Sequence, residues 1–271
     1  MEFFRPKNPA AAIRLLRKPG SIPLAGGTAF TGVPSAKRLV DLTALKLAYV
    51  KENAKTIRVG ATTTIAQLEK SPVAKSFCGG ILYQACDELA DTPLKNMITV
   101  GGNLACRHLW AHLPPVLMVL DGEVSLLGKK RAISVEEFLR KRPRRGDAIA
   151  EVRIPKEKNS GGGAFLKFSR TKNDYARAIA TASASMENGR IKSLRVAVSG
   201  ALPPTRLREL EEALIGQEPS SDAIKIAVDS TVQKLEISRS IFFSEEYLRE
   251  ILGVLTRRAI AKAVGLNGGN V

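Results

Sequence analysis

Hydrophobic residues in the first 155 positions come in short runs separated by polar turns, a pattern typical of alternating helices and strands. In "NPAAAIRLLRKPG", Asn8 suits a helix cap, Pro9 the first turn, and Pro19-Gly20 the end of the helix. The runs "IPLA" and "RLVDLT" predict strands, and "LAYVKENAKTIRVGA" predicts a hairpin that turns at "KENAK". A short capped helix in "TTIAQLEKS" and helical spacing in "GILYQACDELAD" follow.

Further along, "LPPVLMVLDGEVSLLG" predicts a helix entered through prolines, a turn at Asp121-Gly122 and a strand. "AISVEEFLRKR" predicts a small helix capped by Ser134, and "AIAEVRIP" predicts a strand ended by Pro155. The charged, glycine-rich "KEKNSGGG" at 156–163 is typical of a linker between domains.

The residues after this linker have a different pattern. Two long β-like runs meet at Asn188-Gly189, which predicts a hairpin. Helical patterns follow near 206–215, 220–234 and 244–264, so an antiparallel sheet with helices on one face is expected. We predict an α+β protein in which residues 1–155 form one domain, 156–163 a linker, and 164–271 a smaller α+β domain.

The composition is that of a globular protein, with 44% hydrophobic and 25% charged residues in 271. No apolar run approaches the roughly 18 residues of a membrane-spanning helix, and the start lacks the basic flank of a secretory signal. Cys78, Cys86 and Cys106 are an odd number without a CxxC pair, so neither a disulfide framework nor a cluster or zinc site held by this chain alone is expected. These features predict a cytoplasmic protein.

The formal net charge of +16 raises the question of a nucleic-acid partner. The basic residues are dispersed, however, and the densest run, "KRPRRG" at 141–146, lacks the interleaved aromatic residues of a single-strand binder. We expect a solvated loop or a face that docks on an acidic partner subunit, and no nucleic-acid partner.

The segment "CRHLWAH" is the nearest approach to a metal-ligand cluster, with Cys106, His108 and His112. The two histidines would share one face if the segment were helical. We favour a loop that carries two unrelated histidines, and keep metal binding as a minor hypothesis.

Two pairs of adjacent glycines follow short apolar runs, in "PLAGGTAF" (23–30) and "TVGGNLA" (99–105). Glycine permits close backbone approach, and consecutive backbone N–H groups can form a nest that accepts an anion such as pyrophosphate. Neither GxGxxG nor GxxxxGK[ST] occurs, so the Rossmann and P-loop sites are not supported. Taken singly, each pair favours a plain turn.

A wider resemblance rests on five segments that occur in this order: "LAGGTAF", "RLVDLTAL", "IRVGATTTIAQLE", "LADTPLKNMITVGGNLA" and "LPPVLMVLDGEVSL". Together they resemble the FAD-binding medium subunit of the xanthine dehydrogenase and carbon monoxide dehydrogenase family of molybdenum hydroxylases. The resemblance continues through "FLKFSRTKNDYARAIATASA" and covers nearly the whole chain. It implies an FAD-binding domain of two α/β subdomains up to residue 155, followed by a smaller α+β domain with an antiparallel sheet and helices.

The resemblance also implies the residues of an FAD site. The loop that would wrap the FAD pyrophosphate through backbone amides consists of Ala25, Gly26, Gly27, Thr28 and Ala29. The second wall, facing the ribityl and phosphate region, consists of Thr99, Val100, Gly101, Gly102 and Asn103, with Cys106 just beyond it. The remaining positions are Leu89 and Ala90 approaching the flavin, Ile149 and Ala150 covering the cofactor from the strand side, and Lys167 near the ring.

Each of the outlying positions has a simpler alternative. Core packing accounts equally well for Leu89, Ala90, Cys106, Ile149 and Ala150, and an exposed strand position for Lys167. No catalytic side chain and no metal ligand is implied.

His112 in "AHLPP" departs from the family pattern, because many relatives have an acidic residue there, and the preceding "CRHLWA" is bulkier than in those relatives. An imidazolium at His112 would favour a reduced anionic flavin, and a histidine at the surface is the alternative. In another interpretation, Trp110 and His112 restrict the access of an external oxidant. His112 is therefore included among the expected cofactor-binding residues, and the electron acceptor is left open.

The resemblance implies an electron-transfer flavoprotein. A molybdopterin-binding large subunit would oxidise the substrate, a small subunit with two [2Fe-2S] clusters would pass the electrons to FAD on this chain, and a dimer of heterotrimers is expected. Two alternatives remain at this point. One is a stand-alone FAD oxidoreductase of the vanillyl alcohol oxidase type, and the other is a basic, cofactor-free binding or assembly protein.

Overall fold

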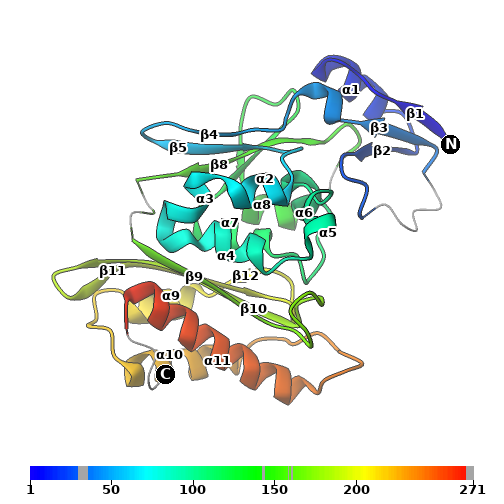
Figure 1. Cartoon of the computed structure of the whole chain (residues 1–271). Helices are drawn as coiled ribbons and strands as arrows, with labels where there is room; N and C mark the ends of the chain where they lie inside the picture. Colours follow the sequence, from blue (N-terminus) through cyan, green and yellow to red (C-terminus); the bar gives the residue numbers. More distant parts are fainter. Residues whose placement is uncertain (30–35, 142–143, 158, 160, 267–271) are drawn as a thin grey trace.

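Three units are stacked in the molecule, from the N-terminal unit to the C-terminal domain (Figure 1). The computed structural model describes residues 1–29, 36–141, 144–157, 159 and 161–266. Arg142 and Pro143 of the basic run, Lys158 and Ser160 of the expected linker, and residues 267–271 lie outside the described residues. The mixture of helices and sheets confirms the predicted α+β class.

The first unit is a parallel three-stranded sheet, ordered β1–β3–β2, with one helix packed on it. Its elements are β1 (Glu2–Phe4), α1 (Pro9–Leu16), β2 (Ser21–Leu24) and β3 (Arg38–Asp41). Asn8 caps α1 by accepting a hydrogen bond from the N–H of Ala11, which confirms the predicted helix start. Ala12 and Leu16 bury α1 in a small core with Val40 of β3.

The second unit is a five-stranded antiparallel sheet, ordered β4–β5–β8–β6–β7, with helices on one side. Its strands are β4 (Val50–Glu52), β5 (Thr56–Gly60), β6 (Glu123–Leu126), β7 (Ile133–Ser134) and β8 (Ile149–Pro155). Its helices are α2 (Ile65–Lys70), α3 (Pro72–Ser76), α4 (Ile81–Asp87), α5 (Thr92–Lys95), α6 (Val100–Ala105), α7 (Leu113–Val119) and α8 (Val135–Arg140), with 3-10 turns η1 (Thr43–Leu45) and η2 (Phe77–Gly80). The predicted β4–β5 hairpin, the turn after α7 and the Ser134 cap are confirmed.

The C-terminal domain is a four-stranded antiparallel sheet, ordered β12–β11–β10–β9, with three helices. Its elements are β9 (Gly162–Phe168), β10 (Ala178–Glu187), β11 (Arg190–Ser199), β12 (Thr205–Arg206), α9 (Arg208–Leu214), α10 (Ser221–Val232) and α11 (Glu245–Val264). Asn188 and Gly189 have φ of 51° and 75° and form the predicted hairpin turn. Because β9 begins at Gly162, the chain joins the sheet before the end of the expected linker at 156–163.

Both faces of this C-terminal sheet are covered. Helices α4 and α7 of the second unit lie on one face, and α9, α10 and α11 on the other (Figure 1). Alternate residues of the strands serve the two cores: Phe165 and Ile179 enter the core of the second unit, whereas Ala164 and Ala180 pack under the C-terminal helices. The C-terminal domain is thereby held against the second unit.

Candidate cofactor site

The two glycine pairs lie next to each other. The first loop leaves β2 after Leu24, and Gly26 packs directly on the chain before the second pair. A methyl group added at Gly26 would lie only 1.6 Å from the carbonyl oxygen of Met97. Since Met97 stands two residues before Thr99, both glycine segments border one region of the surface.

The second glycine segment is anchored to the residues after β5. The N–H of Gly101 donates to the oxygen of Ala61 at 2.8 Å, and the N–H of Val100 donates to the oxygen of Thr63 at 2.9 Å. Ala61 in turn donates its N–H to the oxygen of Ala150 at 2.9 Å. The backbone of Ala150 on β8 therefore supports the second glycine segment through one intermediate residue.

The two glycines of each pair have different surroundings. Gly26 faces Met97, and a methyl group at Gly101 would lie 2.8 Å from Cβ of Ala61, so both are packed against protein. At Gly27, which has φ of +75°, the only neighbour within 4 Å among the described residues is Cδ1 of Leu24 at 3.7 Å. At Gly102 it is Oγ1 of Thr99 at 2.9 Å, the hydroxyl that caps α6. The second glycine of each pair thus faces space that the described residues do not fill.

The same region offers unused hydrogen-bond donors. Within the described residues, no hydrogen bond uses the backbone N–H groups of Gly26, Gly27 or Thr28. Asn103 accepts a hydrogen bond from the N–H of Leu113 through Oδ1 at 3.1 Å, and its Nδ2 has no acceptor among the described residues. Consecutive N–H groups around a glycine with positive φ form a concavity suited to an anion. The residues present therefore fit the pyrophosphate of FAD.

A second group of expected residues gathers around β9. The Lys167 side chain is only 4% exposed, and Nζ donates to the oxygens of Glu88 at 2.5 Å and Lys172 at 2.6 Å. Burial lowers the pKa of Lys167. Leu89 and Ala90, which follow Glu88, are brought close to this lysine. The alternative of an exposed strand lysine is wrong.

His112 is buried, with 2% of its surface exposed, where α7 begins. Its Nδ1 lies 3.0 Å from the oxygen of Ala85, and its ring packs on Phe165 at 4.9 Å between centroids. Burial lowers the pKa of His112 to about 3, and the positive charge of Lys167 acts in the same direction. The expected imidazolium is therefore wrong, because the ring is neutral at neutral pH, and the surface alternative is wrong as well.

The two histidines of "CRHLWAH" are used separately. His108 stacks on Trp110 with centroids 4.4 Å apart, and Trp110 contacts Tyr175 at 4.8 Å. No group of three His, Cys, Asp or Glu side chains suited to a metal occurs in the part of the chain that the structure describes. Cys106 donates from Sγ to the oxygen of Asn103 at 3.3 Å, and burial raises the pKa of its thiol.

The expected site residues thus form two groups. The glycine end comprises Ala25, Gly26, Gly27, Thr28, Ala29, Thr99, Gly101, Gly102 and Asn103. The ring end comprises Leu89, Ala90, His112 and Lys167. The hydrogen bond from Leu113 to Asn103 joins the two, whereas the side chain of Ile149 belongs to the hydrophobic core. Sequence reasoning did not single out Ala61 or Met97, whose only signal was membership in the segments "IRVGATTT" and "KNMITVGG".

Comparisons with known proteins agree with this architecture. Residues 1–157 match the family described as the FAD binding domain in molybdopterin dehydrogenase, and residues 163–263 match the CO dehydrogenase flavoprotein C-terminal domain. The 6-hydroxypseudooxynicotine dehydrogenase complex subunit alpha of Paenarthrobacter nicotinovorans is 32% identical over 83% of this chain and 79% of its own length. The carbon monoxide dehydrogenase medium chain of Afipia carboxidovorans is 25% identical over 97% of this chain and 96% of its own.

A solved structure shows the same fold. The reconstituted CO dehydrogenase from Oligotropha carboxidovorans contains a chain that superposes with a TM-score of 0.91, at 25% identity and 98% coverage of both chains. Fold and site together define a flavoprotein component of an oxidoreductase. The chain belongs to the family of FAD-binding medium subunits of molybdenum hydroxylases, and its cofactor is FAD. The described residues include no helix that is long and apolar enough to cross a membrane.

Proposed function

We propose that this chain takes electrons from the [2Fe-2S] clusters of a small partner subunit and passes them to an external acceptor. A molybdopterin-binding large subunit oxidises the substrate, and the complex is a dimer of heterotrimers. Relatives over nearly the whole chain are subunits of dehydrogenase complexes, which supports this arrangement over a stand-alone oxidoreductase. The three cysteines are free, which supports a cytoplasmic location.

The observation that carries the proposal is the set of unused donors at the glycine end. Gly26, Gly27 and Thr28 offer backbone N–H groups, and Gly27 keeps the space in front of them open. FAD, when bound, supplies one- and two-electron redox chemistry. The chain's own part is to hold the pyrophosphate at the glycine end and to exclude water at the ring end.

The ring end supports the proposal in a different way. Lys167 and His112 are already engaged by the carbonyl oxygens of Glu88 and Ala85. Because hydrogen bonds hold both groups in place, little reorganisation is needed when charge on a neighbouring group changes. No side chain of the described site has to act as an acid or base, and the substrate is selected on the large subunit.

An absorbance spectrum of the purified complex tests the proposal. Flavin bands together with iron-sulfur absorption, both reduced on addition of a substrate of the large subunit, are expected. Flavin bands alone in a chain that purifies without partners would contradict the electron-transfer role and favour a stand-alone oxidoreductase. A preparation that shows no flavin bands after incubation with FAD and removal of the unbound FAD by gel filtration would contradict the assignment of the glycine end.

A further inference from the structure

One side of the first unit carries a concentrated positive charge, which we call the α1 surface. It is made by the exposed residues of α1 and of two neighbouring loops: Arg14, Arg17, Lys18, Lys129, Lys130, Arg131, Arg144 and Arg145. All eight are exposed. They are eight of the 42 Lys and Arg residues of the chain.

The three segments are adjacent in space. A methyl group added at Gly146 would lie 2.9 Å from Cγ of Arg17, so the loop with Arg144 and Arg145 borders α1. A methyl group at Gly128 would lie 2.6 Å from Cδ1 of Ile13, so the turn that leads into Lys129 borders α1 as well. Residues separated by more than 100 positions in sequence therefore contribute to one basic surface.

None of these cations forms a salt bridge within the described residues, although Glu137 interacts electrostatically with Arg131. Some basic side chains elsewhere are paired, as Arg58 and Arg153 are with Glu151 at 2.8 Å and 2.6 Å. Like charges held close together repel each other and are stabilised by a bound surface of opposite charge. The α1 surface therefore has the electrostatics of a docking site for an anionic partner.

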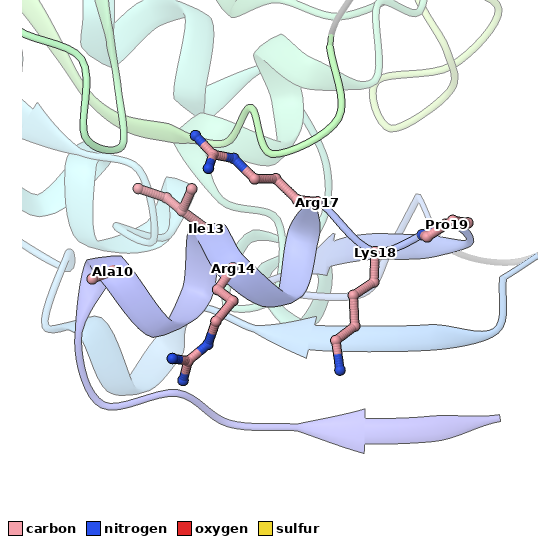
Figure 2. A pocket seen from close by; sticks show the side chains of 6 residues that line it. All are labelled: Ala10, Ile13, Arg14, Arg17, Lys18 and Pro19. Atoms are coloured by element: carbon pink, nitrogen blue, oxygen red, sulfur yellow. The ribbon is translucent and has the colours of Figure 1, made fainter.

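A shallow hollow lies in this surface. It is lined by Ala10, Ile13, Arg14, Arg17, Lys18 and Pro19 (Figure 2). Figure 2 shows Arg14 and Lys18 extending outward from one side of α1, while Arg17 extends toward the neighbouring loop. The lining combines apolar groups with cations at its rim. This combination suits a protein segment with an apolar side chain among carboxylates better than a nucleic-acid backbone, which offers charge without an apolar anchor.

The α1 surface lies away from the glycine end. Lys18 precedes β2, whereas the glycine loop follows β2, so the whole strand separates them. A partner on α1 would leave the glycine loop free. A second copy of this chain would present the same positive charge to it, which disfavours self-association there.

We propose that the α1 surface docks an acidic segment of another subunit of the same complex. This inference rests on the proposed membership in a complex, and it does not depend on the FAD site. Carboxylates of the partner pair with Arg14, Arg17 and Lys18, and an apolar side chain enters the hollow beside Ile13.

The test compares two charge-reversed forms of the full chain, each co-expressed with the large and small subunits. The first carries Arg14→Glu, Arg17→Glu and Lys18→Glu. The control carries Lys225→Glu, Arg239→Glu and Arg258→Glu, which are exposed and unpaired positions among the described residues of the C-terminal domain. Both triple variants change the net charge equally, so long-range effects are matched.

Binding of each flavoprotein to the other subunits is measured at low and at physiological salt, with FAD content and thermal midpoint as checks on folding. The α1 variant is expected to bind roughly 10- to 100-fold more weakly at low salt, with a smaller salt dependence, while the control binds like the wild type. Equal binding of the α1 variant and the wild type would overturn this proposal alone. A wild-type chain that fails to bind the other subunits would instead overturn the proposed function.

Two anionic probes test whether the α1 surface binds nucleic acid or an anionic membrane instead of a protein. A double-stranded DNA oligonucleotide and vesicles containing anionic lipid are titrated with the wild type and the α1 variant at physiological salt. Weak binding to both, unaffected by the substitutions, is expected. Tight binding of either probe that is lost in the α1 variant and kept in the control would replace the protein partner with that probe's class.

Discussion

The glycine end and the ring end of the site are prepared for a ligand in different ways. At the glycine end, the N–H groups of Gly26, Gly27 and Thr28 have no acceptor among the described residues, and those residues leave the space beside Gly27 unfilled. At the ring end, Lys167 and His112 are buried and already hydrogen-bonded to backbone oxygens. The glycine end therefore offers hydrogen-bond donors for a ligand, whereas the polar side chains of the ring end are already paired within the protein.

This difference indicates which end supplies affinity. Unsatisfied donors favour an anion, so we expect the pyrophosphate to bind where the backbone N–H groups have no acceptor among the described residues. At the ring end, His112 is neutral because burial lowers its pKa to about 3, so its charge does not change between pH 6 and pH 8. Between pH 6 and pH 8, the reduction potential of the flavin should therefore not depend on protonation of His112.

The largest effect on stability and FAD content is expected from a substitution at Gly26, where the first glycine segment contacts the second. Gly26→Ala would place a methyl group 1.6 Å from the oxygen of Met97 and force the two segments apart. We expect a loss of about 3 kcal/mol in the free energy of unfolding, together with loss of FAD. Urea denaturation and FAD content measure both. Gly253→Ala is the control, because Gly253, like Gly26, does not have a positive φ and no atom of the described residues outside its own helix lies within 4 Å of its added methyl group. Full stability and full FAD in Gly26→Ala would show that the segments do not touch.

A smaller effect is expected on the pH dependence of the free energy of unfolding, and it comes from His112 at the ring end. His112 has a pKa of about 3 when folded, against about 6.5 in an unfolded chain. Below pH 6.5 the unfolded state binds a proton that the folded state does not, so stability falls as the pH falls, by about 2 kcal/mol at pH 5. His112→Gln removes this contribution. Urea unfolding at pH 7.5 and pH 5 should show a smaller difference in the variant, and an equal difference would place His112 in an accessible position.

The smallest effect is expected on FAD affinity, from loss of the single side-chain donor of Asn103. Asn103→Asp keeps the oxygen that accepts from Leu113 but removes Nδ2 and adds negative charge near the expected pyrophosphate. FAD affinity should fall roughly 10- to 100-fold with little loss of stability. Asn53→Asp in the β4–β5 turn is the matched control. Titration of the FAD-free chains with FAD compares the affinities, and equal dissociation constants would remove Asn103 from the site.

Local rules predicted much of the fold. The Asn8 and Ser134 caps and the Asn188-Gly189 turn depend only on residues a few positions apart, and each was confirmed. The resemblance supplied the site residues. Their individual roles could not be predicted, because the deciding contacts are distant in sequence: Gly26 meets Met97, and Gly101 meets Ala61.

The contacts at the ring end could not be predicted from the sequence either. Lys167 donates to the backbone oxygen of Glu88 and lies 3.7 Å from the carboxylate of the same residue, and His112 packs on Phe165 from the C-terminal domain. Neither partner can be inferred from spacing, because each contact requires the C-terminal sheet to pack on the helices of the second unit. The sequence suggested a charged histidine, and tertiary packing produced a neutral one.

The FAD content of Gly27→Val beside Gly189→Val tests the central claim most directly. Both glycines have φ of +75° and open surroundings, so valine imposes similar backbone strain at each. Only Gly27 lies at the glycine end. After gel filtration, Gly27→Val should be folded and without FAD, while Gly189→Val keeps one FAD per chain. Stoichiometric FAD with unchanged affinity in Gly27→Val would contradict the assignment of the glycine end as the pyrophosphate site.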